Sequence, residues 1–286
     1  MTVSRAVTGM PPDSSAGASA DGSGYPEYRP SAASREVGSA RPPALIAVAH
    51  GSRDPRSAAT VSAVVAAIAD TRPDIDIRTA FLDLTAPSVE QAVDAVAAQG
   101  HTHAVVTPLL LGSAFHARVD LPGLLAAARA RHPRLRLTQA DVLGTDPGLI
   151  SALRDRVRAA CCAGRAVADR RLGIAVAAVG SSSAAANART AEAADLLAAR
   201  TGWRTEICFA TTEPSVTEAV TRLHARGADR VLVAPWFLAP GRLTDRLALA
   251  APDAIHADVL GPHPALTAVI LDRYHSAIAQ RTALSA

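Results

Sequence analysis

An internal repeat is the feature of this sequence that most constrains its fold. Residues 44–160 align with residues 172–279 in four ordered blocks. The blocks pair ALIAVAHGS with GIAVAAVGS, AFLDLTAPSVEQAV with CFATTEPSVTEAV, HAVVTPLLL with DRVLVAPWFL, and DVLGTDPGLISALRDR with DVLGPHPALTAVILDR. Because four blocks seldom recur in one order by chance, we interpret the second half as a duplicate of the first.

Each unit alternates short apolar runs with longer segments of helical spacing. In the first unit we expect strands at 45–49, 76–82, 104–111 and 136–142, and helices at 57–69, 88–98, 123–131 and 147–160. This alternation predicts a parallel sheet with helices on both faces. Two copies predict a bilobal α/β protein with its site in the cleft between the lobes. Because the second unit is shorter between Pro235 and Asp258, we expect it to lack the helix that follows Asp120.

Composition sets the domain boundaries and excludes several function classes. Residues 1–43 are rich in Ser, Ala, Gly and Pro, so we expect a disordered tail, followed by units at 44–165 and 172–286. A net charge of +3 is too small to indicate nucleic-acid binding. The three cysteines include no CxxC spacing, so no iron–sulfur cluster is expected. Without a long apolar run or a signal peptide, we expect a cytoplasmic protein with no membrane association.

Three polar residues of the first unit follow its expected strands. His50 directly follows the first strand, Asp83 ends the second, and His116 lies in the loop after the third. Ligands of parallel sheets bind beyond the carboxyl ends of the strands. Two imidazoles and a carboxylate suit a divalent first-row metal, and neutral imidazole can also accept a proton near neutral pH. An alternative is that Asp83 only turns the chain.

The motifs VAHGSRDPRS, AFLDLTAPSVEQAV and VVTPLLLGSAFHARVDLP resemble the sirohydrochlorin chelatases, the CbiX-type class II family in its long two-repeat form. The resemblance covers about residues 44–279. It implies a chelatase-like bilobal fold and a lyase that inserts Fe²⁺ or Co²⁺ into sirohydrochlorin, without a nucleotide, for siroheme or cobalamin synthesis. It assigns metal handling to His50 and His116. The acid that matches Asp83 is commonly Glu in that family.

The second unit lacks the histidine pair, since Val179 stands opposite His50, and Arg242 or Leu243 stands where His116 would be. We therefore expect one working site and an asymmetric cleft in a monomer that is an internal pseudo-dimer. Sirohydrochlorin carries eight carboxylates, so arginines are expected to bind it. The residues expected to contact substrate are Ser52, Arg53, Arg56 and Arg118, with Arg242 and Arg246 on the equivalent loop of unit two.

Two alternatives stay open at this point. Arg53 could simply pair with Asp54 or another neighbour, and Arg56 and Arg118 could likewise pair with nearby acids. Arg242 and Arg246 could be solvated surface residues. The whole chain could be a non-catalytic carrier that binds a metal or a tetrapyrrole. The metal itself is also open: the chain has neither a His-rich tail nor an iron–sulfur motif, which favours iron over cobalt. No cofactor is expected beyond the substrate metal ion.

Overall fold

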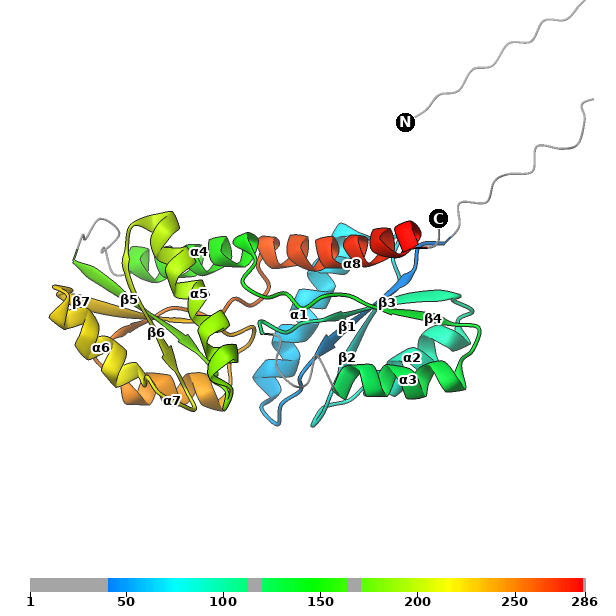
Figure 1. The fold of residues 1–286 in the computed structure, drawn as a ribbon, viewed down its shortest axis with the longest axis horizontal. Helices are drawn as coiled ribbons and strands as arrows, with labels where there is room; N and C mark the ends of the chain where they lie inside the picture. Colours follow the sequence, from blue (N-terminus) through cyan, green and yellow to red (C-terminus); the bar gives the residue numbers. More distant parts are fainter. Residues whose placement is uncertain (1–40, 113–119, 164–170, 285–286) are drawn as a thin grey trace, which may run out of the picture. The chain divides into compact units, whose positions relative to one another are not determined.

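The computed structural model describes residues 41–112, 120–163 and 171–284 (Figure 1). Nearly all of the expected N-terminal tail, together with His116 and Arg118, lies outside these residues. None of the described helices is long and apolar enough to cross a lipid bilayer.

The first half is a parallel four-stranded sheet with the order β2-β1-β3-β4. Its central strand β1 is buried along its whole length, which explains its unbroken apolar sequence. The strands are β1 (Ala44–Ala49), β2 (Ile77–Phe81), β3 (His103–Pro108) and β4 (Arg136–Gln139), and the helices are α1 (Pro55–Thr71), α2 (Val89–Ala98), α3 (Leu121–Arg131) and α4 (Pro147–Ala163). Every expected element of this unit is present, with shifts of a few residues at the ends.

The second half repeats this arrangement in a sheet with the order β6-β5-β7-β8, again with all strands parallel. The strands are β5 (Leu172–Ala178), β6 (Arg204–Phe209), β7 (Arg230–Pro235) and β8 (Ile255–His256), and the helices are α5 (Ala184–Thr201), α6 (Val216–Ala225), α7 (Arg242–Ala250) and α8 (Pro264–Leu284). The duplicated α/β fold is therefore confirmed.

Repeated sequence produces repeated local structure at the starts of α2 and α6. Ser88 accepts a hydrogen bond from the backbone N–H of Gln91, and the Gln91 side chain accepts one from Ser88 N–H. Ser215 and Glu218 form the same capping box at α6. Each box satisfies two backbone donors that a helix start otherwise leaves unpaired.

The expectation that the second unit lacks the helix after its third strand is wrong. Helix α7 occupies that place, with Leu247 as its buried residue. The shortening falls mainly between the third strand and this helix, where residues 109–120 of the first half have only residues 236–241 as their counterpart. The segment of the first half that contains His116 therefore has a much shorter counterpart in the second.

The last helix of each repeat packs on the other repeat. Helix α4 contacts β7 and α5 of the second half, and α8 contacts β3, β4 and α1 of the first (Figure 1). The duplicated arginines on these helices also bond to the other half. Arg156 donates to Leu260 O, and Arg273 donates to Val142 O and Leu143 O. One apolar core therefore joins both sheets, with a separate smaller core on the outer face of each.

Candidate active site

The strand order puts the switch point of the first sheet at the carboxyl ends of β1 and β3, where we expect the candidate site. In a doubly wound sheet, the chain leaves two adjacent strands in opposite directions at such a switch point, and a crevice opens there. His50 directly follows β1, and its side chain is exposed. The loop that leaves β3 leads into the segment that contains His116, which the structure does not describe. Of the predicted metal pair, the structure thus places one member.

His50 and Asp83 lie side by side through their backbones. The N–H of Asp83 donates to the carbonyl of His50 at 3.0 Å, and Leu82 N–H donates to Ala49 O at 2.9 Å. The Asp83 carboxylate accepts a hydrogen bond from Leu84 N–H at 2.7 Å, and the Asp83 side chain is exposed. The structure therefore brings together two of the three residues that the sequence singled out.

Gly51 makes this close approach possible. Its φ of +98° lies in the left-handed region, and a Cβ at this position would lie 1.7 Å from the carbonyl oxygen of Asp83. Leu84 also has a positive φ of 60° and is 50% exposed. A non-glycine residue in this region persists only where its surroundings hold it, and such residues concentrate at functional sites. Both loops of the site are thus held in unusual conformations.

Thr85 connects the two loops and was not singled out from the sequence. Its hydroxyl accepts from Ser52 N–H at 3.1 Å and donates to Ser52 O at 2.9 Å. The Ser52 hydroxyl in turn accepts from Asp54 N–H at 3.0 Å. Ser52, predicted to contact substrate, therefore also organises the turn between β1 and α1. No sequence pattern distinguished Thr85, because its bonds span 33 residues of chain.

Arg56 links the two halves instead of standing free for a ligand. It makes paired hydrogen bonds to the carboxylate of Asp54 and to that of Asp245 on α7. Hydrogen bonds from Arg56 lower the pKa of both carboxyl groups, and those two carboxylates raise the pKa of Arg56. The alternative pairing of Arg53 with Asp54 does not occur. Within the described part of the chain, Arg53 is exposed and makes no hydrogen bond or ion pair.

The second half presents different chemistry at the equivalent strand end. Val179, which follows β5 as His50 follows β1, is 45% exposed. Arg242 and Arg246 are exposed at the start of α7. Arg242 contributes, less than Arg56, to the lowered pKa of Asp54, so it lies near the first half's loop. Among the residues described, no three metal-ligating side chains form a cluster, and His116 is outside them.

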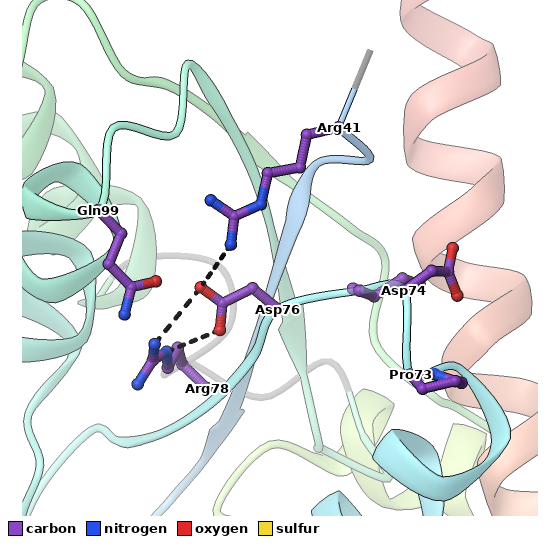
Figure 2. A pocket seen from close by; sticks show the side chains of 7 residues that line it. Arg41, Pro73, Asp74, Asp76, Arg78 and Gln99 are labelled. Carbon is purple, nitrogen blue, oxygen red and sulfur yellow. Dashed lines mark hydrogen bonds and ion pairs between the residues drawn. The ribbon is translucent and has the colours of Figure 1, made fainter. Parts of the chain in front are cut away.

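A cavity of about 510 Å³ lies at the opposite, amino end of the first sheet. Figure 2 shows Asp76 at its centre, paired with Arg41 and Arg78. Asp76 also binds the ring of His101, and His103 contacts Thr138 and Arg136. These histidines are therefore engaged in a polar network at the amino end of the sheet. The cavity is lined by Arg41, Pro73, Asp74, Ile75, Asp76, Arg78 and Gln99.

Known proteins resemble this chain over both halves. The CbiX family model matches residues 44–160 and again residues 173–277. The sirohydrochlorin ferrochelatase of Priestia megaterium is 27% identical over 79% of this chain and 87% of its own length. The sirohydrochlorin cobaltochelatase of the same organism is 28% identical over 71% of this chain but only 66% of its own length, just under two thirds.

Solved structures show the same fold. SirB from Bacillus subtilis with Fe³⁺ superposes with a TM-score of 0.70 at 24% identity, over 84% of this chain and 97% of that one. The family model covers most of both halves, and the sheet order and strand-end motifs are those of one duplicated unit. The chain therefore belongs to the CbiX family.

Proposed function

We propose that the chain is a sirohydrochlorin chelatase, a lyase that inserts Fe²⁺ or Co²⁺ into the macrocycle without a nucleotide. The observation that carries this is His50 at the carboxyl end of β1, at the switch point of the sheet and bonded through its backbone to Asp83. Family membership supports it, and so do relatives named for both metals.

The reaction needs two services that these side chains can supply. The metal must be held loosely enough to pass to four ring nitrogens, and two pyrrole N–H protons must leave as the metal enters. His50 and His116 hold the metal as neutral imidazoles. One of them, or the adjacent Asp83, takes up the departing protons and releases them to water. Asp83 stands where the family commonly has Glu, and its side chain is shorter.

The second half forms the opposite wall of the cleft. Its Val179 cannot bind a metal, so metal insertion belongs to the first half, and duplication within one chain makes a homodimer unnecessary for building the cleft. Substrate carboxylates bind Arg53 and Arg118, and they compete with Asp245 for Arg56. The exposed Arg242 faces the same mouth from the second half. The units at 44–165 and 172–286 thus have unequal roles, although the last helix of each packs on the other.

Iron is the first choice of metal, because the sequence has neither a His-rich tail nor an iron–sulfur motif. Cobalt is close behind, because affinity alone separates these two ions poorly. The test is the change in absorbance of sirohydrochlorin under anaerobic conditions, with each metal, with and without the protein. A chelatase accelerates insertion above the spontaneous rate with less than one protein per tetrapyrrole. A carrier, the second candidate, binds the metal or the tetrapyrrole without that acceleration, and this result would refute the enzyme assignment.

A further inference from the structure

The two halves satisfy one pair of backbone groups with different side chains. In the first half, the N–H and carbonyl of Ser52 both bond to the Thr85 hydroxyl, at 3.1 and 2.9 Å. In the second half, the equivalent Ser181 bonds to the Asn187 side chain. Its N–H donates to Asn187 Oδ1, and its carbonyl accepts from Asn187 Nδ2, both at 2.8 Å. The turn after the first strand of each half therefore needs a partner for these groups, and each half supplies its own.

The choice of partner decides what the turn is attached to. Asn187 lies on α5, the helix that the turn itself begins, so the second half ties the turn to its own continuation. Thr85 lies in the loop after β2, two residues beyond Asp83. In the first half, the turn that carries His50 is therefore tied to the loop that carries Asp83.

This tie adds to a contact that both halves share. Asp83 N–H bonds to His50 O at 3.0 Å, and Thr211 N–H bonds to Val179 O at the same distance. In the second half the Thr211 hydroxyl donates to the same Val179 carbonyl at 2.8 Å. Among the described residues, the first half alone adds bonds on the other side of its glycine, Gly51, through Ser52 and Thr85. The histidine and the acid thus hold a fixed relation at two points in the half that keeps the metal motif. Leu84, with its positive φ, lies in the chain between Asp83 and Thr85.

We propose that Thr85 is a positioning residue for metal insertion, which fixes the Asp83 carboxylate relative to the His50 imidazole; this rests on the proposed function. Thr85 need not touch the metal or the macrocycle. A metal ligand depends on the groups that orient it, and removing such a group typically weakens metal binding about tenfold to a hundredfold. Loss of the Ser181–Asn187 bonds in the second half should leave metal binding unchanged, because Val179 stands there in place of His50.

The test compares Thr85→Val, which keeps the shape but loses both hydrogen bonds, with Thr85→Ser, which keeps the hydroxyl. Asn187→Leu is the matched control, because it removes the equivalent pair of bonds in the second half. Each full-length protein is titrated with Co²⁺ alone, followed by the absorption of the bound ion, and then assayed for insertion. Thr85→Val should weaken Co²⁺ binding about tenfold or more and raise the KM for metal more than that for sirohydrochlorin. Thr85→Ser and Asn187→Leu should bind Co²⁺ as the wild-type protein does.

A second variant separates positioning from stability. Ala58 stands on α1 where Asn187 stands on α5, so Ala58→Asn in the Thr85→Val protein offers Ser52 the bonding pattern of the second half. It should restore the melting temperature but not the Co²⁺ affinity. Recovery of both, or a Thr85→Val protein that equals an active wild type, would overturn the positioning role alone. A wild-type protein that neither binds Co²⁺ nor accelerates insertion would overturn the proposed function and this role with it.

Discussion

Replacing Gly51 with alanine should separate damage to the site from ordinary loss of stability, because Gly180 is its counterpart in the second half. Both glycines have left-handed backbones, with φ of +98° and +92°. Alanine in that region costs about 1–2 kcal/mol at either position. The surroundings differ: the new Cβ of Gly51→Ala would lie 1.7 Å from a backbone oxygen, that of Asp83. The new Cβ of Gly180→Ala would lie 2.9 Å from side-chain atoms of Thr211 and Thr212 and 3.0 Å from the Cβ of Phe209.

A side chain can rotate away from such a contact, whereas the Asp83 carbonyl can move only with its loop. Gly180→Ala should therefore cost the backbone strain and a small packing term, because the Cβ of Phe209, 3.0 Å away, must shift by a few tenths of an ångström. Gly51→Ala adds overpacking of about 1–3 kcal/mol and must push the His50 turn away from Asp83. Each kcal/mol lowers the melting temperature of a chain near this size by about 2–4 °C.

The assay combines thermal unfolding followed by circular dichroism with initial rates of metal insertion, measured well below the melting temperature of each variant. Gly51→Ala should melt lower than Gly180→Ala and lose insertion activity while still folded. Gly180→Ala should keep its activity. Equal melting temperatures and equal rates for the two variants would refute the reasoning, because the 1.7 Å contact with the Asp83 carbonyl is far tighter than any contact at Gly180.

Three further predictions concern charge and burial. Arg53→Ala should raise the KM for sirohydrochlorin and make it less sensitive to salt, measured by initial rates over a range of ionic strength. Because Arg56 holds the pKa of Asp245 below its ordinary 3.8, the pair stabilises the fold above that pH and stops doing so as the pH falls through the folded pKa. Denaturant unfolding should therefore show wild type more stable than Asp245→Asn at neutral pH, with the difference vanishing in acid. Burial raises the pKa of Cys208 to about 12, so iodoacetamide at about pH 8 should alkylate it only after unfolding.

The sequence predicted the repeat, the strands and the helix starts because those signals are local. Apolar runs such as the one in β1 and capping residues such as Ser88 act within a few positions of the chain. Helix α7 was missed because it is short and polar, with only one residue, Leu247, buried along it. The exchange of α4 and α8 was invisible for another reason: an apolar helix face does not specify which sheet it covers.

The candidate site divides in the same way. His50 and Asp83 could be found because each follows a recognisable strand, and parallel strands bring their ends together. The engagement of Arg56 by Asp245 and of Ser52 by Thr85 depends on residues far away in the sequence. Only the folded backbone brings these pairs together. Comparison of the halves in three dimensions then revealed Thr85 and Asn187 as two solutions to one requirement.

The most direct test of the central claim is the anaerobic rate of Fe²⁺ and Co²⁺ insertion into sirohydrochlorin by wild-type protein, His50→Ala and His132→Ala. His132 lies just after α3, at the amino end of the same sheet, and serves as the matched histidine control. The account predicts that wild type and His132→Ala accelerate insertion above the spontaneous rate, whereas His50→Ala does not. A His50→Ala protein as fast as wild type, or a wild type no faster than the spontaneous reaction, would contradict it.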